Sequence, residues 1–317
     1  MQPVTQRYSS AFLSLLILLT VIGSSGCYRP GVATRPKVDA GLGQLAYDAL
    51  APRSGTVIII DPRTGRVLSR VGHSADLQFE SPVFELAQLI TAYAALSSGA
   101  INEKTVLPCD GETINVVEAI GRDCHSFFRV LSEKTTLEAF ARSAEALGFV
   151  YYGVENSADG SRTVRPIGVR LPTHLERGEF AELAAAGQVM LARDLHFVNL
   201  VTTLASGRTT AERFADYIST TARAPAPLME SLNAAALAIV KKGLTRAVES
   251  GELAGAATFS GIVAAKAGGS TGRAVLISYA PANNPDVCLV VSLPDGGRRA
   301  AADVAGRFYQ TYFIKRK

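Results

Sequence analysis

Strand-like segments lie at both ends of this chain, and helix-like segments lie between them. Residues 56–71, with the sequence TVIIIDPRTGRVLSRV, place two β-branched runs around a connection that contains proline and glycine, which predicts a β-hairpin. The runs AVLISYA and VCLVVSL, at residues 274–280 and 287–293, predict a second hairpin. This order favours an α/β (α+β) fold in which the N- and C-terminal segments build one antiparallel sheet around a helical insert.

The segments between the hairpins carry apolar residues at helical spacing. Residues 82–96 show this spacing and end at Ser97, Ser98 and Gly99, which predicts a well-buried helix. The last helix, at residues 299–312, is expected to cover a face of the sheet. The same spacing predicts helices at residues 116–131, 136–147 and 195–205 and one that ends near residue 249.

The composition is that of a packed domain and excludes several classes of function. Of the 317 residues, 48% are hydrophobic and 19% are charged, which does not fit a disordered or coiled-coil chain. The net charge is +4, and no long basic run precedes the last three residues, so nucleic acid is not an expected partner. The four cysteines lack paired C-x-x-C spacing, so no structural metal is predicted. No cofactor is predicted either.

The N-terminus has the pattern of an export signal. An uncharged apolar stretch at residues 11–22 is too short to span a membrane, and small residues lead from it to Cys27. This arrangement resembles a bacterial lipobox, although Ser24 stands where leucine is usual. It predicts a signal peptide at residues 1–26, a lipidated Cys27, a tether at 27–38 and one domain at 39–317. Simple cleavage and an uncleaved anchor are the alternatives, and all three place the domain outside the cytoplasmic membrane.

The other cysteines admit two interpretations. In an oxidising compartment Cys109 and Cys124 could form a disulfide, but two free buried cysteines fit the sequence equally well. Cys288 lies in the apolar run VCLVVSL and is interpreted as a core residue. The remaining residues of interest are interpreted as structural or exposed: His73, His174, His196, Gly187, Gln188, Gly296 and Gly297.

Five different segments of the chain are informative when they are taken together in chain order. They are GTVIIIDPRTGRVLSRV, ESPVFE followed by LITAYAALSSGAI, VVEAIGRDCHSFFRVL, AAGQVMLARDLHFVNLVTTLASG and SGIVAAKAGGSTG. Together they resemble the transpeptidase domain of penicillin-binding proteins, the serine acyltransferases that cross-link peptidoglycan and share their fold with serine β-lactamases. The resemblance covers residues 39–313 and implies a β-lactamase/transpeptidase-like fold.

The first motif of that family is S-x-x-K, a serine at the start of a buried helix with a lysine that takes its proton. The segment ESPVFE stands where the resemblance implies a phrase close to PGSTFK, so Pro82 takes the serine position and Glu85 the lysine position. No S-x-x-K occurs in this sequence. If the frame slides by one residue, Ser81 becomes a fallback nucleophile, but Phe84 then takes the lysine position.

The residues of this segment also suit a plain helix start. Ser81 would be the N-cap, Pro82 the first helical residue, and Glu85 a favourable charge near the positive end of the helix dipole. In this interpretation the segment still starts the helix but has no catalytic role.

In the second motif, S-x-N, the resemblance puts Asp123 and His125 in place of the serine and the asparagine, with Cys124 between them. A carboxylate and an imidazole could exchange a proton. Two residues apart on a helix or turn, they are not expected to face one another, so His125 is interpreted as a surface histidine.

In the third motif, K-T-G-T, Lys266 and Gly268 are retained, while Ala267 and Gly269 replace the two threonines that would bind the substrate carboxylate. Lys266 and Gly268 are therefore the substrate-binding candidates, because small residues on this strand let a peptide backbone approach. The alternative is an edge lysine that is merely solvated or that discourages strand pairing.

These motifs predict an envelope-anchored domain that has lost its acylating residues and acts by binding. The resemblance implies peptidoglycan stem peptides or a cell-wall synthesis protein as partners, with the membrane reached through the N-terminal anchor. One alternative is a divergent serine D,D-transpeptidase or carboxypeptidase that acylates through Ser81, with Glu85 as a base whose pKa burial has raised. Another is a structural lipoprotein whose groove has closed.

Overall fold

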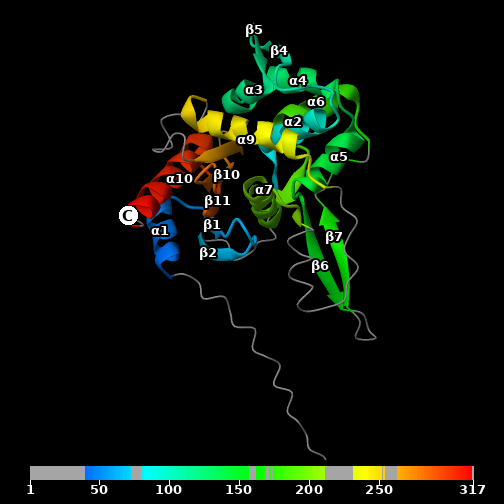
Figure 1. The fold of residues 1–317 in the computed structure, drawn as a ribbon. Helices are drawn as coiled ribbons and strands as arrows, with labels where there is room; N and C mark the ends of the chain where they lie inside the picture. The colour runs from blue at the N-terminus through cyan, green and yellow to red at the C-terminus, as the bar shows by residue number, and fades with distance from the viewer. Residues whose placement is uncertain are drawn as a thin grey trace, which may run out of the picture. The chain divides into compact units, whose positions relative to one another are not determined.

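A five-stranded antiparallel sheet lies at the centre of the structure, with the strand order β2-β1-β11-β10-β9 (Figure 1). Its strands are β1 (Thr56–Ile60), β2 (Val67–Gly72), β9 (Ala264–Gly269), β10 (Ala274–Ala280) and β11 (Val287–Leu293). The computed structural model describes residues 40–72, 80–156, 162–168, 171–172, 174–210, 231–251, 253, 263–270 and 272–315. Both hairpins predicted from the sequence are present, since β1 pairs with β2 and β10 pairs with β11.

The two ends of the domain meet in this sheet because β1 pairs antiparallel with β11. Ile58 lies opposite Val290, and Ile59 lies opposite Leu289. All five residues of β1 are buried, as expected for a central strand that is covered on both faces. The predicted fold, one sheet built from the N- and C-terminal segments, is confirmed.

Helices cover both faces of the sheet. Val57 and Ile59 pack with residues of α1 (Ala40–Leu50) and α10 (Gly297–Ile314). Ile58 and Ile60 alternate with them along β1 and belong to a second cluster with α2 (Ala87–Ser97) and α7 (Asp194–Ser206). One short strand of β-branched residues therefore contributes to both layers of the core.

The helix α2 is buried within the helical part, as the sequence predicts. Gln88 Nε2 donates a hydrogen bond to the Ala185 carbonyl over 2.9 Å, and Thr91 Oγ1 donates to the Ala184 carbonyl over 3.0 Å. These bonds join α2 to α6 (Arg177–Ala186). The other helices of this part are α3 (Val116–Arg122), α4 (His125–Ser132), α5 (Leu137–Ala146), α6 (Arg177–Ala186) and α9 (Ala234–Glu249).

Short strand pairs interrupt the middle of the chain, which the sequence pattern predicts to be helical. They are β3 (Glu80–Pro82) with β8 (Leu191–Arg193), β4 (Val106–Cys109) with β5 (Glu112–Asn115), and β6 (Val150–Asn156) with β7 (Arg162–Gly168). The single helix predicted at residues 116–131 is also divided into α3 and α4. The division occurs at Asp123, which adopts the left-handed conformation with φ of 58°.

Residues 1–39 lie outside the described part of the chain. The signal peptide, the tether, the lipidation of Cys27 and the domain boundary at residue 39 therefore remain predictions. Among the described residues, none of the helices combines the length and the apolar character that crossing a membrane requires.

Candidate functional site

The segment before α2 is extended rather than helical. Residues 80–82 form β3 and pair with β8, with Ser81 opposite Ala192. The 3-10 turn Phe84–Leu86 follows, and α2 begins only at Ala87. The interpretation of Ser81 as an N-cap and Pro82 as the first helical residue is therefore wrong, because pairing with β8 outweighs the local preference for a helix start.

Glu85 lies on this turn and contacts the edge strand β9. Its Oε2 accepts a hydrogen bond of 2.8 Å from the Gly269 backbone N–H. The approach is close because Gly268 has no side chain: a Cβ there would lie 2.8 Å from Phe84 Cβ and 3.0 Å from the Glu85 nitrogen. The retained Gly268 is itself buried, so it has a packing role beneath the turn.

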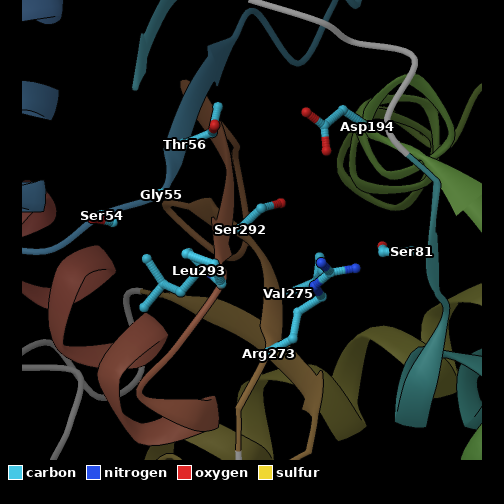
Figure 2. A pocket seen from close by; sticks show the side chains of 10 residues that line it. Ser54, Gly55, Thr56, Ser81, Asp194, Arg273, Val275, Ser292 and Leu293 are labelled. Carbon is cyan, nitrogen blue, oxygen red and sulfur yellow. The ribbon is translucent and has the colours of Figure 1, made fainter. Parts of the chain in front are cut away.

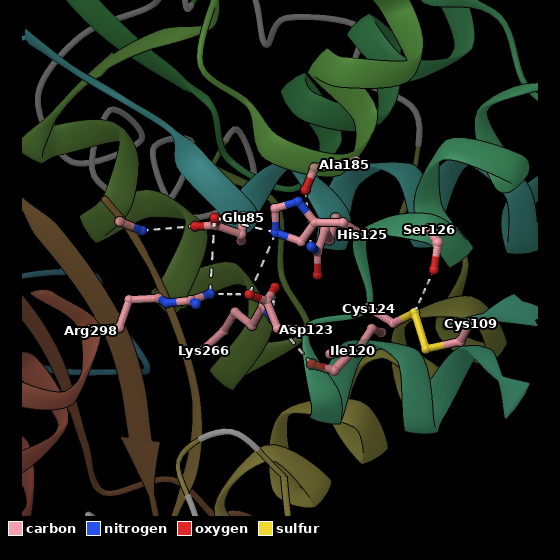
Figure 3. Close-up of polar contacts among 12 residues, drawn as sticks. Glu85, Cys109, Ile120, Asp123, Cys124, His125, Ser126, Ala185, Lys266 and Arg298 are labelled. Atoms are coloured by element: carbon pink, nitrogen blue, oxygen red, sulfur yellow. Dashed lines mark hydrogen bonds and ion pairs between the residues drawn. A yellow bond between two sulfur atoms is a disulfide. The ribbon is translucent and has the colours of Figure 1, made fainter. Parts of the chain in front are cut away.

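Lys266 is bound inside the protein. Its Nζ donates hydrogen bonds to Asp123 Oδ1 over 2.9 Å and to the Ile120 carbonyl over 3.2 Å. None of its side chain is exposed, so the interpretation of a solvated edge lysine is wrong. The left-handed backbone at Asp123 ends α3 and directs the carboxylate to the lysine on β9 (Figure 3).

His125 faces both carboxylates. Its Nε2 lies 3.4 Å from Glu85 Oε1 and 3.7 Å from Asp123 Oδ2, and 38% of its side chain is exposed. The expectation that Asp123 and His125 would not face each other is therefore wrong. The chain turns at Asp123 and starts α4 at His125, so the helical spacing on which the expectation rested does not apply.

Arg298, in the first turn of α10, completes this group of charges. Its Nη1 contacts Asp123 Oδ2 and lies 3.9 Å from Glu85 Oε1 (Figure 3). No motif in the sequence points to this arginine. We call Glu85, Asp123, His125, Lys266 and Arg298 the charge network.

The network shifts the pKa values of Asp123 and His125 in the directions that favour their ionised forms. Burial alone would raise the pKa of Asp123, but Lys266, His125 and Arg298 together hold it well below its ordinary value. The carboxylates of Asp123 and Glu85 raise the pKa of His125 to about 9, against the opposing effect of burial. At neutral pH the Asp123 carboxyl group is therefore ionised and the His125 ring is protonated.

A disulfide links this site to the β4–β5 hairpin. Cys109, at the end of β4, is bonded to Cys124, which lies between Asp123 and His125. Of the two interpretations that the sequence allows, the structure has the paired one. Cys288 is buried in β11, as expected for a core residue.

Within the part of the chain that the structure describes, two groups of side chains bring metal-ligating atoms together, but the structure does not favour a metal at either. Glu85, Asp123 and His125 have ligand atoms within 4.8 Å of one another. A divalent cation there would have to compete with Lys266 and Arg298 for the same carboxylates. In the second group the sulfur atoms of Cys109 and Cys124 are already bonded to each other.

Ser81 lies outside the charge network. It is buried on β3 and lines a separate cavity together with Asp194, Arg273 and Ser292 (Figure 2). Lys266 is not among the residues that line this cavity. The proposed pairing of a Ser81 nucleophile with the Glu85 base has no hydrogen bond to support it among the described residues.

The residues interpreted as structural have packing or exposed positions. His196 is buried, and its Nδ1 accepts a hydrogen bond of 2.8 Å from the Arg193 N–H, whereas His174 is exposed. Gly187 ends α6 with φ of 59°, and a Cβ there would lie 2.2 Å from the Phe84 carbonyl oxygen. Gln188 is exposed, Gly296 caps α10, Gly297 begins it, and His73 lies outside the described residues.

Comparison with known proteins gives structural matches alone. No protein-family model and no curated protein matches the sequence. The transpeptidase domain of Burkholderia pseudomallei penicillin-binding protein 3 is 18% identical with a TM-score of 0.69, and the match covers 91% of this chain and 98% of that one. Pseudomonas aeruginosa PBP2, in complex with WCK 5153, is 18% identical with a TM-score of 0.68, covering 88% and 78%.

A third structure agrees with these two. PBPA from Mycobacterium tuberculosis is 17% identical with a TM-score of 0.65, and the match covers 87% of this chain and 82% of that one. The central sheet made from both termini, the buried α2 and these matches lead to one conclusion: the chain has the fold of the penicillin-binding protein transpeptidase domains.

Proposed function

We propose that this protein is a non-acylating member of the penicillin-binding protein-like transpeptidase domains, which acts by binding in peptidoglycan assembly. One observation carries the proposal. Pro82 and Glu85 occupy the positions where the resemblance places the acylating serine and lysine. The retained Lys266 is fully buried against Asp123. The charged side chains that meet at this site are paired with one another.

The geometry supports this proposal because acyl transfer needs a nucleophile within hydrogen-bond reach of a base. Pro82 has no hydroxyl group. The Glu85 carboxylate is engaged by the Gly269 N–H and faces His125 and Arg298. The Lys266 amino group is engaged by the Asp123 carboxylate and the Ile120 carbonyl, so it is not placed to accept a proton from a nucleophile.

The predicted substrate-binding role of Lys266 and Gly268 would need this site to open. Both residues are buried, and the Phe84–Leu86 turn lies directly over Gly268. His125 and Arg298, which are 38% and 36% exposed, are the members of the network that solvent reaches. An anionic group of a partner would therefore meet these two side chains first.

Two partners fit the proposal: a peptidoglycan stem peptide and a cell-wall synthesis protein. The second is supported by a complex of Helicobacter pylori PBP2 with MreC, in which PBP2 is 14% identical to this chain with a TM-score of 0.65. We propose that the protein lies outside the cytoplasmic membrane and is attached through a lipidated Cys27. The Cys109–Cys124 disulfide supports that location, because disulfides persist in oxidising compartments.

Labelling with a fluorescent penicillin tests the proposal. The purified protein is incubated with the probe beside a competent penicillin-binding protein, and adducts are read on a gel and by intact mass. We expect no covalent adduct, and we expect saturable binding when soluble muropeptides or cell-wall synthesis proteins are titrated.

The variant Ser81→Ala separates the alternatives. An adduct on the wild-type protein that is lost in Ser81→Ala would establish the acylating alternative. An adduct that persists in the variant would reveal a different nucleophile and would equally overturn the proposal.

A further inference from the structure

The Phe84–Leu86 turn begins with a strained backbone. Phe84 has a φ of 54°, in the left-handed region that a bulky side chain rarely adopts. The chain is held on both sides of this residue, since the Val83 N–H donates to the Met190 carbonyl over 2.9 Å and the buried helix α2 begins at Ala87. The strained residue therefore lies in a short link between two fixed elements, and backbone strain of this kind is concentrated at clamps and switch regions.

Two glycines from other elements make room for this conformation. A Cβ at Gly187, where α6 ends, would lie 2.2 Å from the Phe84 carbonyl oxygen. A Cβ at Gly268 on β9 would lie 2.8 Å from Phe84 Cβ. Packing on both sides thus holds a backbone that a phenylalanine would not adopt on its own.

The Glu85 carboxylate ties this turn to the edge of the central sheet. Among the described strands, β9 is the last of its sheet and pairs with β10 alone. An outward N–H on an edge strand can bind another molecule, but here the Gly269 N–H donates to Glu85 Oε2 over 2.8 Å. An acceptor from another molecule therefore has to displace this carboxylate first.

The same carboxylate faces two cationic side chains. Glu85 Oε1 lies 3.4 Å from His125 Nε2 and 3.9 Å from Arg298 Nη1, the members of the charge network that solvent reaches (Figure 3). A backbone N–H, an imidazole and a guanidinium thus surround one buried side chain. Such groups commonly bind the carboxylate of a ligand, and here a carboxylate of the chain itself occupies them.

We propose that Glu85 is an internal ligand and that the Phe84–Leu86 turn is a latch, which keeps the edge of β9 closed until the carboxylate is released. The strain at Phe84 favours release, because this residue can return to an ordinary backbone conformation once the carboxylate has left. The inference rests on the proposed function, since a closed edge regulates only a protein that binds there. Its test uses neither penicillin nor a cell-wall partner, so the two proposals can fail separately.

Hydrogen exchange of the Gly269 amide, followed by NMR, tests the latch. In Glu85→Ala this amide loses its acceptor and should exchange about tenfold faster, or more, than in the wild-type protein. Truncation to alanine removes the equivalent of an acetate ion, so added acetate should slow the exchange again in a saturable way. Acetamide has the same shape without the charge and should have a much smaller effect. The wild-type protein should not respond to acetate.

The His125 ring gives a second readout that packing alone would not change. The carboxylates of Asp123 and Glu85 raise the pKa of His125, so its titration midpoint should fall in Glu85→Ala and rise again when acetate binds. Glu182→Ala is the matched control, because the Glu182 carboxylate pairs with Arg129 at the surface and is 58% exposed. It should leave both readouts unchanged.

A glycine variant opens the latch while the carboxylate is kept. In Gly268→Ala the added Cβ would lie 3.0 Å from the Glu85 nitrogen, so the turn has to move away from β9 and the Gly269 amide should exchange faster. Gly178→Ala, where a Cβ meets open space, is its control. Should Glu85→Ala fail to fold, Glu85→Gln, which keeps the volume and removes the charge, should speed the exchange about fivefold.

Three results would overturn the latch. The first is a Gly269 amide that exchanges in the folded Glu85 variant as it does in the wild-type protein. The second is an exchange rate in Glu85→Ala that acetate does not change saturably. The third is equal protection of this amide by acetamide and by acetate.

Discussion

Replacement of Lys266 by methionine is expected to lower the free energy of unfolding by about 3 kcal/mol. Methionine fills much of the same volume, so the main loss is the ammonium ion that pairs with Asp123 inside the protein. Removing the lysine takes one counter-ion from the buried Asp123 carboxylate and puts no water in its place. The expected effect is at the lower end of the usual range because Arg298 still contacts Asp123. Equilibrium unfolding in urea measures it.

Lys242→Met is the matched control for this experiment. Lys242 pairs with Glu103 at the surface, where 56% and 42% of the two side chains are exposed. An exposed pair contributes less than about 1 kcal/mol, so this variant should resemble the wild type. The double variant Lys266→Met with Asp123→Asn should recover part of the stability, because asparagine tolerates the left-handed backbone and carries no charge. A single Lys266→Met variant as stable as Lys242→Met would contradict the buried pair.

Removal of the Cys109–Cys124 disulfide is expected to lower the free energy of unfolding by about 3 kcal/mol. The bond closes a loop with a sequence separation of 15, and the cross-link restricts the unfolded chain. In Cys109→Ala/Cys124→Ala the Asp123 and His125 segment also loses its covalent connection to β4. Unfolding of the wild type and the double variant, each with and without a reductant, measures the effect.

The reductant provides the control for this prediction. It should destabilise the wild-type protein and leave the double variant unchanged, because the variant has no such bond to lose. Wild-type protein that unfolds at the same urea concentration with and without reductant would show that the bond does not stabilise the folded domain.

The sheet could be predicted because the residue types within each strand are enough to indicate a strand. The runs TVIII, AVLISYA and VCLVVSL are rich in β-branched and apolar residues, and they form the three inner strands β1, β10 and β11. The short ladders could not be predicted in the same way. Ser81 and Pro82 have the local preference of a helix start, and only the distant residues of β8 hold them in a strand.

Four residues of the site could be predicted from the sequence, but their arrangement could not. The resemblance identifies Glu85, Asp123, His125 and Lys266 by their motif positions. Their mutual contacts depend on the left-handed backbone at Asp123, which helical spacing does not reveal. Arg298 comes from the last helix and reaches the site through tertiary packing alone, so no pattern in the sequence identifies it.

Titration of His125 by NMR tests most directly whether these side chains form one network of ionised groups. The ring signals are followed from pH 5 to pH 11 and are assigned by their loss in His125→Gln. Because the carboxylates of Asp123 and Glu85 favour the protonated ring, the midpoint should lie at about 9, and Asp123→Asn should lower it towards the ordinary value of about 6.5. A midpoint at or below about 6.5 in the wild-type protein, unchanged in Asp123→Asn, would contradict the network and the function proposed from it.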